Sequence, residues 1–81
     1  MDIPVQTKFR FFPESNTLII SRSNIGGIAI FPGLRLHNKQ GTWTVKRVKP
    51  AKVTLVRYGK DEVVPAENLA KDYFRDELWT S

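Results

Sequence analysis

The clearest strand pattern in the chain is carried by the stretch Thr42-Trp43-Thr44-Val45-Lys46-Arg47-Val48-Lys49. Trp43 and Val45 are apolar and alternate with polar residues, which is typical of a strand that buries one face. The alternation then slips by one position, so that Val48 is the next apolar residue. A β-bulge near Lys46-Arg47 accounts for this slip. We therefore predict a bulged β-strand here, with Trp43 in the core.

Short strands separated by turns are expected on both sides of this stretch. In residues 5–12, Phe9 and Phe11 fall on one face and Lys8 and Arg10 on the other, which again is a period of two. A turn over residues 13–16 then predicts a hairpin with a second strand at 17–20. Further strands are expected at 28–31, 34–36, 53–58 and 62–64, separated by polar or glycine-bearing segments at 21–27, 37–41, 49–52 and 59–61.

The end of the chain has a helical pattern. Pro65 suits the first position of a helix, and Glu67 is placed favourably in its first turn. Leu69, Tyr73 and Phe74 would form an apolar stripe along this helix. We predict one domain over residues 1–81 with a mostly β fold. It consists of a small β-barrel over residues 5–64, which begins with the N-terminal hairpin, and a short C-terminal helix over residues 65–78.

Four segments carry a family resemblance: Gly33-Leu34-Arg35-Leu36, Gly41-Thr42-Trp43-Thr44-Val45, Val53-Thr54-Leu55-Val56 and Glu62-Val63-Val64-Pro65-Ala66-Glu67-Asn68-Leu69. Together they resemble an SH3-like barrel of the Tudor or KOW type. The last segment resembles the closing strand and short helical turn of the RNA-polymerase-interacting domains of CarD-type transcription regulators. The segments are also similar to the basic DNA-binding barrels at the ends of some integrases and transposases. The resemblance implies an SH3-like barrel, a fold that hosts many functions.

Size and composition restrict the kinds of protein this chain can be. A chain of 81 residues forms a thin core, and without cysteine it has no disulfide or thiolate metal site to support that core. No stretch approaches the roughly 20 apolar residues of a membrane helix, and the first residues lack the pattern of a signal peptide. We therefore expect a cytoplasmic protein that does not bind a membrane.

Charge is distributed unevenly along the chain. Up to Lys60 there are eleven basic and two acidic residues, a balance of +9, whereas the balance from Asp61 onward is −4. A basic body with an acidic tail predicts a polyanionic partner, above all a nucleic acid. The alternative, that the charge serves only solubility, stays open.

The predicted nucleic-acid-binding residues lie on and after the strand at 42–49. Several should share one surface, because cross-strand neighbours lie about 5 Å apart. Such a surface can follow a phosphate backbone, and an aromatic ring beside it can stack on a base. The sequence leaves open DNA or RNA, and single or double strand. The predicted set is Lys46, Arg47, Lys49, Lys52, Arg57, Tyr58 and Lys60, which Lys8, Arg10, Arg22 and Arg35 would extend if the first hairpin packs alongside.

A protein-interaction module, such as a binder of the transcription machinery, is the alternative function. The predicted helix has an acidic face, and Tyr73, Leu78 and Trp79 would provide an apolar interface. The sequence equally supports the alternative that Trp79 folds back and covers the core. Residues 28–31 are a candidate edge strand for pairing between two subunits, so a homodimer stays open.

Catalysis is not expected. His37 is the only histidine, and the sequence places no nucleophile or acidic residue close to it. Neighbouring acids such as Asp61-Glu62 or Asp76-Glu77 point to opposite faces of a strand and do not converge on a metal. The glycine-bearing segment Ser23–Gly27 lacks the pattern of a phosphate-binding loop. We therefore predict a binding protein without catalytic residues, a metal site or a cofactor.

Overall fold

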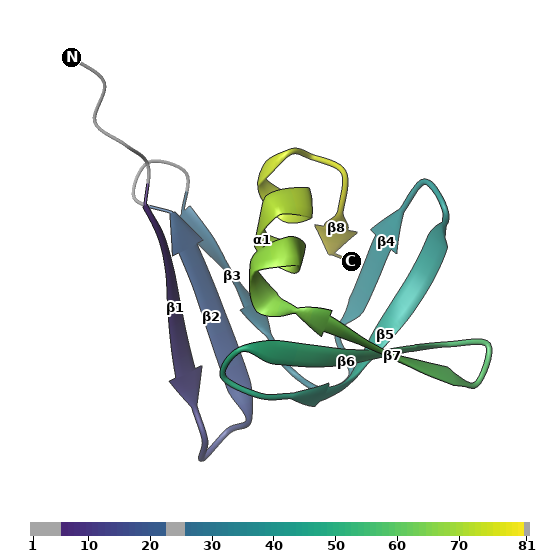
Figure 1. The fold of residues 1–81 in the computed structure, drawn as a ribbon, viewed down its shortest axis with the longest axis horizontal. Coiled ribbons are helices and arrows are strands. Elements are labelled where there is room, and N and C mark those ends of the chain that lie inside the picture. The colour runs from purple at the N-terminus through teal and green to yellow at the C-terminus, as the bar shows by residue number, and fades with distance from the viewer. Residues whose placement is uncertain (1–5, 23–25, 81) are drawn as a thin grey trace.

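The fold is mostly β with one short helix, as predicted (Figure 1). The computed structural model describes residues 6–22 and 26–80. Val5 of the predicted first strand and residues 23–25 of the predicted 21–27 segment lie outside the described residues. The elements in chain order are β1 (Thr7–Phe12), β2 (Thr17–Arg22), β3 (Gly26–Ile30), β4 (Arg35–Asn38), β5 (Gly41–Val48), β6 (Lys52–Arg57), β7 (Lys60–Pro65), α1 (Ala66–Phe74) and β8 (Trp79–Thr80).

The strands form two antiparallel sheets. The first has the order β1-β2-β3 and contains the predicted N-terminal hairpin. The second has the order β7-β6-β5-β4-β8, so the last strand of the chain returns to pair with the first strand of this sheet. Among the described residues, β7 and β8 form the two edges of the five-stranded sheet, and no ladder between them closes it into a barrel.

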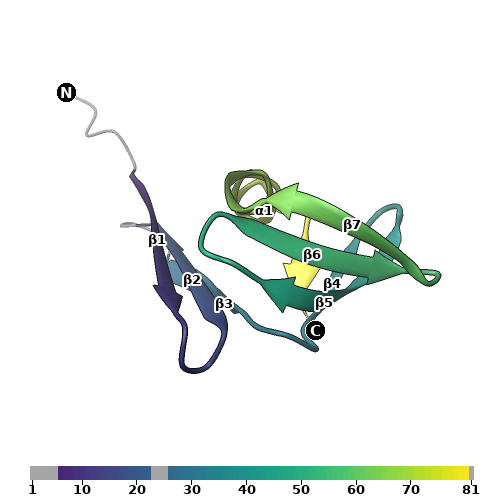
Figure 2. The same cartoon turned by 60° about the horizontal axis from the view of Figure 1, so that its bottom comes forward.

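One hydrophobic core joins both sheets and the helix. Leu18, Ile20, Ile28 and Ile30 reach it from the first sheet, and Leu69 reaches it from α1. The helix lies against one face of the five-stranded sheet (Figure 2). The opposite face of this sheet stays open to solvent, because its residues are exposed or only half-buried. The side chains of the five-stranded sheet that enter the core are Leu36, Val45, Val48, Val53 and Leu55.

The bulge predicted in β5 is confirmed. Val45 pairs with Leu55 and Arg47 with Thr54, so the register shifts between these two pairs and Lys46 is the extra residue. Val45 and Val48 can therefore both stay buried, although an odd number of steps separates them. The bulge satisfies the apolar pattern without exposing a valine.

The helix is shorter than the predicted span of residues 65–78. Pro65 ends β7 with an extended backbone and precedes the first helical residue, and α1 ends at Phe74. Asp76 then takes a left-handed conformation with φ of 59°, which terminates the helix and turns the chain back. The apolar stripe is confirmed, because Leu69 is buried and Tyr73 and Phe74 pack against the core. In residues 6–22 and 26–80, α1 is too short to cross a lipid bilayer and no other helix is present.

Candidate nucleic-acid interface

The open face of the five-stranded sheet is built by the alternation of its strands. Val53 and Leu55 of β6 are buried, so Lys52 points to the other side of the sheet. In the same way, the burial of Val48 in β5 sends Arg47 to the open side. Arg35 is the first residue of β4 and is exposed. Leu34 and Leu36, its two neighbours in the chain, are buried.

Two further lysines belong to this side. The amide of Lys49 donates a hydrogen bond to the carbonyl of Lys52 at 2.9 Å, which sets these two residues opposite each other at the end of the β5–β6 hairpin. Lys46, the bulge residue, reaches across the open side to Asp61 of β7, with 2.8 Å between Nζ and Oδ2. We call the resulting set the basic face: Arg35, Lys46, Arg47, Lys49 and Lys52.

The basic face carries a strong excess of positive charge. Among the described residues of the open side, Asp61 is the only acidic one, and it is engaged by Lys46. The strand neighbours between the cations are threonines at positions 44 and 54, which are small and polar. Glu62 points to the opposite side of β7, and the remaining acids of the C-terminal region lie on α1 or in the turn after it. The basic face therefore carries a local excess of positive charge, whereas the acids of the C-terminal region lie away from it.

The predicted set of seven residues is thus only partly brought together. Arg57, Tyr58 and Lys60 lie at the other end of β6, about 17 Å along the strand from Lys52. The Arg57 guanidinium lies on the core side, 4.4 Å from the centre of the Trp43 ring and 5.2 Å from that of Tyr58. It also donates to the carbonyl of Gln40 at 3.1 Å. Arg57 therefore packs against Trp43 and Gln40 at this end of the sheet and does not belong to the basic face.

The cations that would extend the set are also dispersed. Arg35 lies on the basic face. The sequence had suggested that it would extend the set if the first hairpin packed alongside. Lys8 and Arg10 lie on β1 in the other sheet, where the Arg10 guanidinium is 5.0 Å from the centre of the Phe12 ring. Arg22 lies over Phe74 of α1 at 4.5 Å. Both aromatic contacts are of cation–π distance.

The residues predicted for a protein interface have different environments. Leu78 is buried in the core, and Tyr73 packs against the core with its ring centre 5.2 Å from that of Phe74. Trp79 is 42% exposed, so it does not cover the core as fully as a folded-back residue would. These residues line a shallow hollow of about 350 Å³ beside β8. Of the three, only Trp79 offers a large exposed surface.

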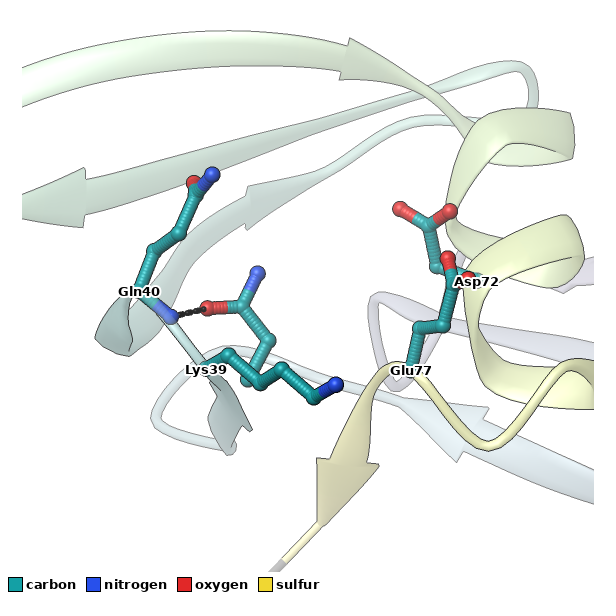
Figure 3. A pocket seen from close by; sticks show the side chains of 5 residues that line it. Lys39, Gln40, Asp72 and Glu77 are labelled. Atoms are coloured by element: carbon teal, nitrogen blue, oxygen red, sulfur yellow. Dashed lines mark hydrogen bonds between the residues drawn. The ribbon is translucent and has the colours of Figure 1, made fainter.

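A second hollow of about 320 Å³ separates the β4–β5 turn from the C-terminal acids (Figure 3). Lys39 and Gln40 lie on one side of it, and Asp72 and Glu77 on the other. The turn is held by Asn38, whose side-chain oxygen accepts hydrogen bonds from the amides of Gln40 and Gly41. This hollow is lined by two acids and one lysine, and none of the residues of the basic face lines it.

His37 has a structural partner in the sheet. Its Nδ1 lies 2.9 Å from the hydroxyl oxygen of Thr42, which is directly opposite in the β4–β5 ladder. His37 is therefore a strand residue, whereas the sequence placed it in a turn. The described part of the chain contains no group of three or more acidic or histidine side chains that could hold a metal ion.

Comparison with known protein families, characterised proteins and solved structures found no match to this chain. The candidate interface is therefore argued from the geometry of this chain alone. Sequence reasoning gave Arg35 a lesser place, although the pattern Leu34-Arg35-Leu36 already signals an outward cation between two buried leucines. It had no signal for the β4–β8 pairing that sets Trp79 beside His37.

Proposed function

We propose that this protein binds nucleic acid through the basic face. The proposal is carried by one observation: four cations from three adjacent strands, and Lys49 in the turn between β5 and β6, point to one open side of a sheet, where Asp61 is the single acid among the described residues. Lysine and arginine contacts to phosphates supply most of the sequence-independent affinity for nucleic acids. Lys49 and Lys52 repel each other across the hairpin, and a phosphate between them would relieve this repulsion.

The geometry sets the expected salt dependence. Lys46 is compensated by Asp61, so four cations are available for phosphates. Four contacts to a single strand give a slope of log K against log salt of about −2.8, and four to a duplex about −3.6. The single-strand slope corresponds to a loss of about 50-fold in affinity between 50 and 200 mM salt.

The test compares two triple variants with the same net charge. Arg47→Gln/Lys49→Gln/Lys52→Gln removes three cations of the basic face, whereas Lys39→Gln/Lys71→Gln/Arg75→Gln removes three exposed cations elsewhere. Binding of fluorescent single- and double-stranded oligonucleotides is measured by anisotropy across a salt series. For a single strand, the first variant should lose about 100-fold in affinity at 0.1 M salt and about 2 units of slope. The second should stay within about threefold of the wild type, because its cations lie outside the interface.

Two results would contradict the proposal. If the wild type does not bind either kind of oligonucleotide at 50 mM salt, the basic face has no nucleic-acid function. If both triple variants lose affinity equally, net charge rather than this face drives the interaction. Circular dichroism of each variant checks that the fold is retained.

We also propose that residues 33–80 belong to the SH3-like class of small barrels. The proposal is supported by the strand order, because four consecutive strands form a meander and the strand after the helix returns to the first of them. Nuclear Overhauser contacts between Trp79 and His37, and between Thr80 and Leu36, are expected in solution. Their absence would leave β4 as the sheet edge and contradict this fold.

The protein-interaction function remains the second candidate. It is favoured by the hollow between the β4–β5 turn and the residues Asp72 and Glu77, where two carboxylates face one lysine, Lys39, and could receive a basic side chain of a partner. Loss of binding to a partner in the variant Asp72→Asn/Glu77→Gln, with oligonucleotide affinity unchanged, would support this alternative.

A further inference from the structure

Trp79 lies at one edge of the sheet that carries the basic face. It is directly opposite His37 in the β4–β8 ladder, and opposed residues in a ladder point to the same side of a sheet. The neighbouring pair Leu36 and Thr80 belongs to the core side, because Leu36 is fully buried. Trp79 therefore lies on the same side of the β4–β8 ladder as His37, at the edge of the sheet, where it also borders the hollow lined by Tyr73, Phe74 and Asp76.

The position of Trp79 relative to the cations follows from the register. Arg35 and His37 are two residues apart on β4 and point to the same side. One strand spacing across and two residues along place the Cα atoms of Trp79 and Arg35 about 8 Å apart. Arg47, Lys49 and Lys52 continue in the direction away from this aromatic edge. The open side thus has an aromatic end and a cationic end.

The exposure of Trp79 is not required by the fold. Leu78 already fills the core at this point and is only 6% exposed, whereas Trp79 is 42% exposed on a strand of two residues. An indole ring beside a row of phosphate-binding cations provides a stacking surface for a base. Thr42 and Thr44, which are short and polar, are the ladder partners of His37 and Arg35 on this side of the sheet.

We propose that the ligand of the basic face is a single-stranded nucleic acid, with one base stacked on Trp79 while Arg35 and Arg47 contact its phosphates. This inference rests on the proposed function. In a duplex each base is already stacked and paired, so its face is closed to a side chain, whereas in a single strand it is open. The shared chemistry is that of single-stranded DNA and RNA, since both offer base faces and phosphates.

The experiment uses the full chain and four 12-nucleotide probes: single-stranded DNA, single-stranded RNA and the two matching duplexes. Trp79→Leu keeps an apolar residue in β8 but removes the aromatic face, and Trp79→Phe keeps an aromatic ring. We expect the single strands to bind at least about tenfold more tightly than the duplexes. Trp79→Leu should weaken single-strand binding by about 5- to 150-fold, and Trp79→Phe by less than about threefold. The relative affinity for the two single strands shows which of them is the ligand.

Two further readouts separate stacking from a general loss of charge or fold. The salt slope of Trp79→Leu should equal that of the wild type, because no phosphate contact is removed. In the variant Trp43→Phe, Trp79 is the single tryptophan, and its fluorescence should be quenched by a single strand and not by a duplex. Thermal unfolding of both Trp79 variants checks that β8 still pairs with β4.

The outcomes distinguish this inference from the function on which it rests. Equal binding of single strands and duplexes, with Trp79→Leu at wild-type affinity, would overturn the stacking role and leave the basic face as a phosphate-binding surface. Failure of the wild type to bind any probe at 50 mM salt would overturn both. A steep loss in Trp79→Leu with an unchanged salt slope would support the single-strand ligand.

Discussion

Asp61→Asn is expected to strengthen nucleic-acid binding, which is an unusual result for a point substitution on a protein surface. The Asp61 carboxylate lies 2.8 Å from Nζ of Lys46, and about half of each side chain is exposed. Asparagine is nearly isosteric but carries no charge. The substitution therefore releases Lys46 for a phosphate and removes the one negative charge among the described residues of the open face.

The size of the effect follows from counterion release. Each added phosphate contact to a single strand changes the slope of log K against log salt by about −0.7. At 0.1 M salt one more contact tightens binding about fivefold, and at 1 M salt the gain disappears. An exposed ion pair of this kind contributes only about 0–1 kcal/mol to folding, so the variant should stay folded.

The assay is fluorescence anisotropy with a labelled single-stranded oligonucleotide between 0.05 and 1 M salt. Glu62→Gln is the matched control, because it removes one negative charge from the next residue of the same strand, which points to the opposite side of the sheet. It should change the affinity by less than about twofold. If the two variants tighten binding equally, or Asp61→Asn leaves the salt slope unchanged, the local charge balance does not control binding.

Two predictions concern the fold that supports the interface. Arg57→Gln should lower the free energy of unfolding by about 1 kcal/mol in urea titration, because it removes the stacking of the guanidinium on Trp43 and its hydrogen bond to Gln40; an oligonucleotide affinity reduced as much as in Arg47→Gln would place Arg57 in the interface after all. Leu36→Ala should cost about 2–5 kcal/mol, because Leu36 is fully buried between β5 and β8; a cost below about 1 kcal/mol would mean that the β4–β8 region contributes little to the core.

Local patterns predicted the elements well where a strand buries one face. The slip between Val45 and Val48 indicated the bulge, and the alternation around Val53 and Leu55 gave the correct faces of β6. The helix was predicted too long, because Leu78 continues the apolar pattern beyond Phe74. The left-handed Asp76 turns the chain there, so that Leu78 enters the core from the bend before β8 instead of from a helix. The spacing of apolar residues along the sequence does not reveal such a turn.

The candidate site was predicted in part. Lys46, Arg47, Lys49 and Lys52 are neighbours on one hairpin, and the local register is enough to bring them to one side. Arg57 and Lys60 follow closely in sequence, but the length of β6 carries them to the other end of the sheet. Sequence proximity along a strand is therefore a poor guide to proximity on a surface, because each residue advances the chain by about 3.3 Å.

The sequence by itself determined the mostly β fold class, the bulge in β5 and the strong positive charge of the first sixty residues, because these depend on residue type and on a period of two. The tertiary structure decided that Asp61 neutralises Lys46, that Arg57 stacks on Trp43 and that Trp79 lies beside His37. These contacts join residues that are 14 or more positions apart in the chain. They follow from the order of the strands in the five-stranded sheet, and that order is set by packing both sheets and the helix around one core.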